Sequence, residues 1–126
     1  MPTILIADDN RLSRELVRDI LETADCRIIE ARDGAEALAL LDETPPDLLL
    51  LDLEMPAQDG FAVLREVRRN PRFAALPVAA FTARAMQQER EKIQAAGFDA
   101  CITKPVMSAA LRKRVQELLS LRRGRV

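Results

Sequence analysis

The strongest constraint on the fold is an alternation of short apolar runs with amphipathic helical patterns, which repeats five times along the chain. The apolar runs predict strands at residues 3–7, 26–30, 48–52, 77–82 and 100–103. The central run contains four successive leucines, Leu48 to Leu51, which is typical of a strand buried on both faces. The pattern therefore predicts an α/β fold, in which helices cover both sides of a parallel sheet through right-handed crossovers.

Helical patterns lie between and after the predicted strands. They begin after Asn10 and after Asp33, span about 60–69, run from about residue 85 to Gly97, and extend from about residue 108 to Leu119. In the first helix, the positions predicted to face the core are Leu12, Leu16, Val17, Ile20 and Leu21. The fourth helix has a thin apolar stripe, formed mainly by Met86, Ile93 and Ala96, so we expect it to be held less firmly than the others.

The length of 126 residues is sufficient for one domain that folds without disulfides. We expect this domain to occupy residues 1–120, and residues 121–126 to form a short basic tail in solvent, with a linker as the alternative. The formal net charge of −1 gives no reason to expect direct binding to nucleic acid or to a membrane. Because no signal-peptide pattern precedes Asp8, we expect a cytoplasmic protein.

The chain contains no histidine, which restricts the chemistry that it can perform. Its two cysteines, Cys26 and Cys101, are not in a CxxC spacing, so a zinc site is excluded. Catalysis by a serine or cysteine nucleophile with a histidine base is excluded as well. Any reaction must therefore use carboxylates, lysine, threonine or a metal ion.

Polar residues stand where the predicted strands end, and parallel strands bring their carboxyl ends to one edge of a sheet. These residues are Asp8, Asp9, Asp52, Thr82 and Lys104. Each has an ordinary structural explanation by itself: paired acids cap helices, a threonine packs, and a lysine before proline is a loop charge. Their coincidence at one edge indicates a site. We expect the chain to leave the core at Asp52, so that its carboxylate is accessible.

Three neighbouring carboxylates repel one another and raise each other's pKa unless a cation is present. Oxygen ligands without histidine or cysteine favour Mg²⁺. Lys104 would add a second positive charge. A metal ion, a lysine and a hydroxyl donor around a carboxylate are the groups that phosphoryl transfer needs, with charge neutralisation and a positioned nucleophile.

Four segments, ILIADDN, LLLLDLEMPAQDG, AAFTARA and CITKP, resemble in order and spacing the signature segments of the receiver domain of two-component response regulators, the CheY-like family. The resemblance extends from about Thr3 to Leu119. It implies a flavodoxin-like, doubly wound sheet of five parallel strands in the order 2-1-3-4-5, with five helices.

The resemblance also implies a role for each residue at the site. Asp52 matches the phosphoacceptor, which takes a phosphoryl group from a phosphohistidine of a sensor histidine kinase or phosphotransfer protein. Mg²⁺ would be held by the side chains of Asp9 and Asp52 and by the backbone carbonyl of Glu54, with Asp8 holding a metal-bound water. Thr82 and Lys104 match the hydroxyl and ammonium that meet the phosphoryl group. The bond from Lys104 to Pro105 is expected to be cis.

The chain departs from the family pattern at Cys101, where receivers commonly carry tyrosine or phenylalanine. The usual switch, in which the threonine and an aromatic residue move together, therefore lacks its aromatic member here. We expect Cys101 to pack as a small apolar residue, and the alternative is that it is a redox sensor. A disulfide to Cys26 is excluded because strands 2 and 5 lie roughly 19 Å apart. Glu54 and Arg84 occupy positions that in the family tune the loss of the phosphoryl group.

Three functions follow from these observations. The leading one is a phosphorylatable receiver that catalyses its own phosphorylation and dephosphorylation without being a conventional turnover enzyme, and that signals to a protein partner through helix 4, strand 5 and helix 5. It would be a single-domain regulator or a part of a longer chain such as a hybrid kinase. The alternatives are a receiver-like docking module that is not phosphorylated, and a Mg²⁺-dependent phosphohydrolase.

Overall fold

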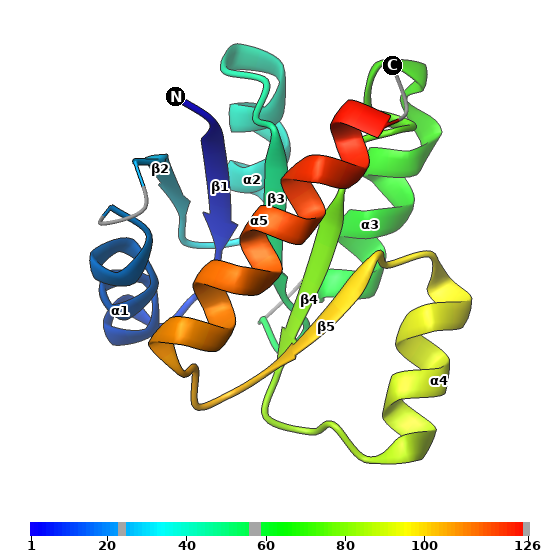
Figure 1. The fold of residues 1–126 in the computed structure, drawn as a ribbon. Helices are drawn as coiled ribbons and strands as arrows, with labels where there is room; N and C mark the ends of the chain where they lie inside the picture. The colour runs from blue at the N-terminus through cyan, green and yellow to red at the C-terminus, as the bar shows by residue number, and fades with distance from the viewer. Residues whose placement is uncertain (23–24, 56–58, 125–126) are drawn as a thin grey trace.

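Five parallel strands form one sheet in the order β2-β1-β3-β4-β5, as predicted (Figure 1). The computed structural model describes residues 1–22, 25–55 and 59–124. The strands are β1 (Thr3–Ala7), β2 (Arg27–Ala31), β3 (Leu48–Asp52), β4 (Val78–Thr82) and β5 (Ala100–Thr103). The predicted bounds are correct for β1, β3 and β5, whereas β2 and β4 each begin one residue later than expected. β3 lies at the centre, between β1 and β4.

Helices cover both faces of the sheet (Figure 1). They are α1 (Arg11–Glu22), α2 (Gly34–Glu43), α3 (Gly60–Arg69), α4 (Gln87–Ala96) and α5 (Ser108–Gly124), with a short 3-10 helix η1 (Pro71–Phe73) that the sequence did not predict. α1 and α5 bury their apolar residues on one face, and α2, α3 and α4 on the other. Within the described part of the chain, no helix is long and apolar enough to cross a membrane.

The four leucines of β3 divide between these two faces. Leu48 and Leu50 pack in the core beneath α1 and α5, whereas Leu49 and Leu51 pack in the core beneath α2 and α3. All four are fully buried. Because successive side chains of a strand point to opposite faces, a continuous apolar run is the pattern that a strand covered on both sides requires. This prediction is confirmed.

Several predictions about helical faces and ends are wrong. Leu12 and Leu16 of α1 are 74% and 46% exposed, and the inward stripe instead comprises Arg14, Val17, Ile20 and Leu21. In α4, only Ile93 is buried, while Met86, which precedes the helix, and Ala96 are exposed. The fourth helix is therefore held by even less apolar contact than predicted. α5 continues through Gly124, beyond the expected end at Leu119.

The two cysteines lie far apart in the sheet, as expected. Cys26 directly precedes the edge strand β2, and Cys101 lies in the opposite edge strand β5. No disulfide joins them in the structure. The exclusion of a disulfide from the predicted strand order is confirmed.

Gly60 brings the start of α3 against the end of β3. A Cβ atom at this position would lie 2.7 Å from the backbone oxygen of Asp52 and 2.9 Å from the Cα of Leu53. The side chain of Asp59 caps the helix by accepting a hydrogen bond from the N–H of Ala62 at 2.9 Å. The absence of a side chain at residue 60 therefore allows the helix to pack directly on the backbone of Asp52.

Arg68 connects the loops at the amino ends of the strands, where β4 and β5 begin. Its Nη1 donates to the carbonyl of Leu76 at 2.7 Å, and its Nη2 donates to Asp99 Oδ2 at 3.1 Å. The same carboxylate oxygen accepts from the N–H of Val78 at 2.9 Å. One guanidinium thus holds α3 to the segments that enter two strands.

We predict that Arg68→Met lowers the free energy of unfolding by about 2–3 kcal/mol, because it leaves these partly buried acceptors without their charged donor. The control is Arg69→Met, since Arg69 pairs with Glu66 on the surface and its side chain is 75% exposed. We expect the control to change the free energy by less than about 0.5 kcal/mol. Urea denaturation measures both, and equal effects would contradict the role assigned to Arg68.

Candidate functional site

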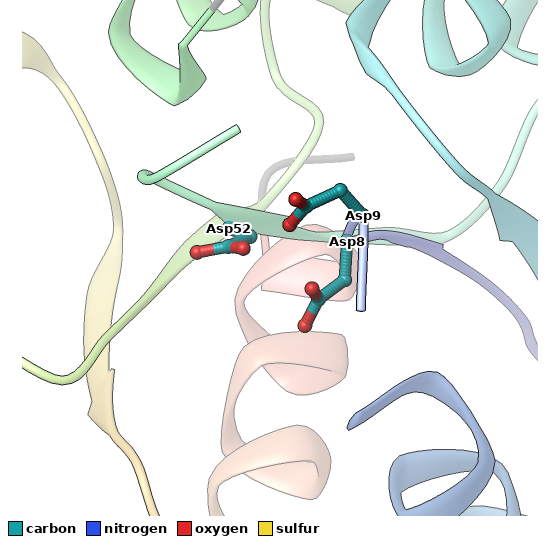
Figure 2. A group of neighbouring side chains, drawn as sticks. All are labelled: Asp8, Asp9 and Asp52. Carbon is teal, nitrogen blue, oxygen red and sulfur yellow. The ribbon is translucent and has the colours of Figure 1, made fainter. Parts of the chain in front are cut away.

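Three aspartates from two strand ends form an acidic cluster, as the strand-end rule predicts (Figure 2). Asp8 and Asp9 follow β1, and Asp52 is the last residue of the neighbouring strand β3. One carboxylate oxygen of each residue lies within 4.8 Å of those of the other two. Asp8 and Asp52 are buried, whereas Asp9 is exposed.

The expectation that Asp52 is accessible is wrong. Asp52 is only 3% exposed, and Leu53 and Met55 after it are buried as well, whereas Glu54 between them is exposed. Its Oδ1 accepts a hydrogen bond from the N–H of Glu54 at 3.1 Å. The N–H of Leu53 also continues the sheet by donating to the carbonyl of Phe81 at 3.0 Å. The carboxylate is thus held inside the molecule rather than at the first exposed position.

Lys104 supplies the positive charge that accompanies the buried carboxylates. Its Nζ lies 3.1 Å from Asp8 Oδ2 and 3.5 Å from Asp52 Oδ2. Its own N–H donates to the carbonyl of Thr82 at 2.9 Å, which fixes the start of the loop after β5. The bond from Lys104 to Pro105 is cis, as the family resemblance implied.

The two buried carboxylates titrate in opposite directions from their ordinary pKa of 3.8. Burial opposes ionisation of Asp8, but hydrogen bonds from Asn10 and Ser13 and the charge of Lys104 lower its pKa. Burial and the negative charge of Asp8 raise the pKa of Asp52 to about 6, against the effects of the Glu54 N–H and Lys104. Burial disfavours the charged form of Lys104. Its hydrogen bond to Asp8 and the negative charges of both carboxylates outweigh this effect and raise its pKa.

Thr82 ends β4 beside the cluster, with a buried side chain. Its hydroxyl lies 3.1 Å from Glu54 Oε1 and 3.3 Å from the carbonyl of Arg84, and its oxygen accepts from the N–H of Arg84 at 2.9 Å. The side chains of Glu54 and Arg84 are at the surface. These contacts bring together three of the residues that the sequence assigned to switching and tuning.

Cys101 lies on β5 and is partly buried. It packs against the core on the α2 and α3 side of the sheet. Burial raises the pKa of its thiol, despite the nearby positive charges of Arg90 and Arg114. A raised pKa lowers the fraction of reactive thiolate, so these surroundings favour the packing role over the redox role.

Sequence reasoning missed two residues that support the cluster. The backbone N–H of Asn10 donates to Asp8 Oδ1 at 2.9 Å, and the guanidinium of Arg14 donates to the backbone carbonyl of Asp8 at 2.8 Å. Asn10 was identified only as a helix cap. Arg14 could have been found from its position, because it stands three residues before Val17 and therefore lies on the same helical face. A charged side chain on a buried face needs a buried partner.

The donor set fits a hard divalent cation. The cluster offers only carboxylate oxygens, and these lie close enough for one ion to contact all three. A single lysine does not balance three carboxylates. The pKa of Asp52 is raised mainly by burial, and the negative charge of Asp8 adds to this effect. Magnesium, which prefers oxygen ligands and retains several waters, fits this arrangement.

The family model for the response regulator receiver domain matches residues 4–116. The polar-differentiation response regulator DivK of Brucella anthropi is 36% identical over 104 residues, which are 82% of this chain and 85% of that protein. The sensor histidine kinase TmoS of Ectopseudomonas mendocina is 36% identical over 121 residues, 96% of this chain but 12% of that protein. The chain therefore belongs to the receiver-domain family of two-component response regulators.

A solved structure shares both the fold and the family. The receiver domain of a sensor histidine kinase from Pseudomonas aeruginosa PAO1, determined with a magnesium ion coordinated in its active site cleft, matches with a TM-score of 0.87 and 28% identity. The match covers 94% of this chain and 98% of that one. Receiver domains bind Mg²⁺ at an acidic pocket of this kind, and they interact with histidine kinases or phosphotransfer proteins.

We predict that Asp52→Asn stabilises the Mg²⁺-free protein at pH 7.5 by an amount on the order of 1–3 kcal/mol. The pKa of Asp52 is raised from 3.8 to about 6 on folding, so its favourable contribution is complete below pH 3.8 and lost as the pH rises through 6. Asparagine cannot ionise and avoids this loss. Urea denaturation in EDTA at pH 7.5 and pH 4.0 measures the effect.

The gain should shrink at pH 4.0, where the wild-type carboxyl is largely protonated as well. The exposed Asp42→Asn serves as a control for the loss of one negative charge, because the Asp42 side chain is 69% exposed. A gain in stability that is the same at both pH values would argue against the pKa assigned to Asp52.

Proposed function

We propose that this receiver domain accepts a phosphoryl group on Asp52. The observation that carries the proposal is the position of this carboxylate. It lies at the carboxyl end of the central strand, within 4.8 Å of Asp8 and Asp9 oxygens and 3.5 Å from the Lys104 ammonium. A buried carboxylate beside an acidic cluster and a lysine is suited to attack phosphorus once a cation is present.

The transfer forms one bond and breaks another. A carboxylate oxygen of Asp52 attacks the phosphorus of a phosphohistidine, the phosphorus–nitrogen bond breaks, and its electron pair leaves with the imidazole nitrogen of the donor. Lys104 and Thr82 are proposed to contact the phosphoryl oxygens after transfer. Asp9, Asp52 and the carbonyl of Glu54 would hold Mg²⁺, with Asp8 binding a water of the ion, and the ion would supply charge neutralisation for those oxygens.

Switching is proposed to begin at Thr82. To reach a phosphoryl group on Asp52, its hydroxyl must leave Glu54 Oε1 and the carbonyl of Arg84, the two acceptors that now lie within hydrogen-bond distance. These contacts lie where β4 leads into α4, and α4 buries only Ile93. We therefore propose that the change is transmitted to the surface formed by α4, β5 and α5, and that this surface binds a downstream protein. Because position 101 is a cysteine, the transmission would not use the aromatic residue that receivers commonly have there.

Several assignments remain part of this proposal. The phosphoryl donor is a sensor histidine kinase or a phosphotransfer protein, and the domain catalyses its own phosphorylation and dephosphorylation without conventional turnover. A cytoplasmic location and the absence of direct nucleic-acid binding stay predictions, as does the division into a domain of residues 1–120 and a tail of residues 121–126. Glu54 and Arg84 are proposed to influence how long the phosphoryl group persists.

We predict that Asp52→Asn abolishes the acid-labile phosphate that the wild type gains on incubation with acetyl phosphate and Mg²⁺. The matched control is Asp59→Asn, which also replaces an aspartate near α3. Asparagine can keep the helix cap that Asp59 makes with Ala62, so we expect normal phosphorylation. Phosphate incorporation is measured by mass spectrometry of the intact protein. Incorporation in Asp52→Asn equal to that of the wild type would show that another residue is the acceptor.

We predict that Mg²⁺ shifts the backbone NMR signals around Asp8, Asp9 and Asp52, and that Asp9→Asn raises the dissociation constant by about tenfold, since it removes one carboxylate ligand. Asp19→Asn removes one charge from the exposed face of α1 and is the control. We expect the control to bind within about twofold of the wild type. An absence of Mg²⁺-dependent shifts at the strand ends would favour the docking module.

A further inference from the structure

Arg14 is a buried arginine on the inward face of α1. It is only 9% exposed and lies on the same stripe as Val17 and Leu21, both of which pack in the core. Burial of an arginine is costly unless its donors find strong acceptors. Its contacts therefore indicate why the position is not occupied by an apolar side chain.

One of these contacts is with the backbone of the acidic cluster. The ladder between β1 and β2 continues one step past the strand, where the N–H of Asp8 donates to the carbonyl of Ala31 at 3.1 Å. The carbonyl of Asp8 then receives Nη1 of Arg14 at 2.8 Å, in a bond that is itself buried. This carbonyl belongs to the peptide that joins Asp8 to Asp9, so its direction constrains where both side chains point.

The second contact fixes the guanidinium itself. Nε of Arg14 donates to Glu30 Oε1 at 3.0 Å, and the other oxygen of Glu30 accepts from Arg18 Nε at 2.7 Å. Glu30 lies on the edge strand β2, so the carboxylate ties α1 to the sheet at two points. A charge-assisted bond on each side of a planar guanidinium leaves it little freedom to rotate.

We propose that Arg14 is a positioning residue for the Mg²⁺ site. Its guanidinium, anchored by Glu30, holds the peptide between Asp8 and Asp9 so that both carboxylates face Asp52. Arg14 acts on the backbone of the ligands and not on the ion or the phosphoryl group. This inference rests on the proposed function, because it concerns the same acidic cluster.

The sign of the effect separates positioning from simple charge. A positive charge near a cation site repels the ion, so removal of Arg14 would tighten Mg²⁺ binding if the charge were its only influence. Loss of a positioning contact has the opposite result. Residues that orient metal ligands typically change metal affinity by about 10–100-fold when they are replaced.

The test compares Arg14→Met with Arg18→Met. Both variants remove one positive charge from α1 and one donor to Glu30, but the other contacts of Arg18 are with Glu22 and the carbonyl of Ile28. In an NMR titration with MgCl₂ at pH 7.5, we expect the dissociation constant to rise about tenfold for Arg14→Met and to stay within about twofold of the wild type for Arg18→Met.

A second measurement needs no Mg²⁺. The N–H of Asn10 donates to Asp8 Oδ1 at 2.9 Å, so its hydrogen exchange reports the position of that carboxylate. In EDTA, we expect this amide to exchange several-fold faster in Arg14→Met than in the wild type, with no change in Arg18→Met. A general loss of stability would instead speed exchange throughout the sheet.

The possible outcomes are distinguishable. If the wild type does not bind Mg²⁺, the proposed function fails, and the exchange of Asn10 still tests the positioning role. If Arg14→Met binds Mg²⁺ as tightly as Arg18→Met, or more tightly, the inference about Arg14 is overturned. Should Arg14→Met not fold, Arg14→Lys decides, because it keeps the charge but cannot reproduce both guanidinium bonds. Wild-type affinity in that variant overturns the inference.

Discussion

The sharing of one ammonium between two buried carboxylates is the interaction on which the site depends. Lys104 lies 3.1 Å from Asp8 and 3.5 Å from Asp52, and exposed Asp9 adds a third negative charge nearby. With all groups ionised, the cluster carries two more negative charges than positive ones. The parallel sheet imposes this imbalance, because it directs the ends of β1, β3 and β5 to one edge. A divalent cation would neutralise this excess negative charge, and this connects the fold to its proposed chemistry.

The sequence predicted the fold and the members of the site for the same reason: both follow from strand positions. Leu48 to Leu51 identified the central strand, and the residues that end each strand could then be assembled before any distance was known. The burial of Asp52 was not predictable in this way, since it arises from contacts with residues distant in the sequence, among them Lys104, which lies 3.5 Å from its carboxylate. The face of α1 was misjudged because a periodicity argument assigns arginine to solvent, whereas Arg14 points inward to Glu30 and the backbone of Asp8.

The contacts of Thr82 describe a resting state in which the hydroxyl is already engaged. It donates toward Glu54 and the carbonyl of Arg84, so the proposed movement exchanges one set of hydrogen bonds for another. The net free energy of such an exchange is small compared with that of forming a bond without losing one. α4, with Ile93 as its buried residue, offers little resistance to a rearrangement of the segment that precedes it. Cys101, at the position where receivers commonly carry an aromatic residue, packs as a small side chain against the core on the α2 and α3 side of the sheet.

The contacts of Arg68 lie at the amino edge of the sheet, where the strands begin, whereas the acidic cluster lies at the carboxyl edge. This separation of scaffold and site bears on how such a domain evolves. Its guanidinium joins α3 to the segments entering β4 and β5, far along the strands from Asp52 and Lys104. Residues at the carboxyl edge can then diversify while the amino edge preserves the scaffold. Charge is partly buried at this edge too, but there Arg68 and Asp99 form an ion pair at 3.1 Å. One sheet thus allows natural selection to change the site and the scaffold through different residues.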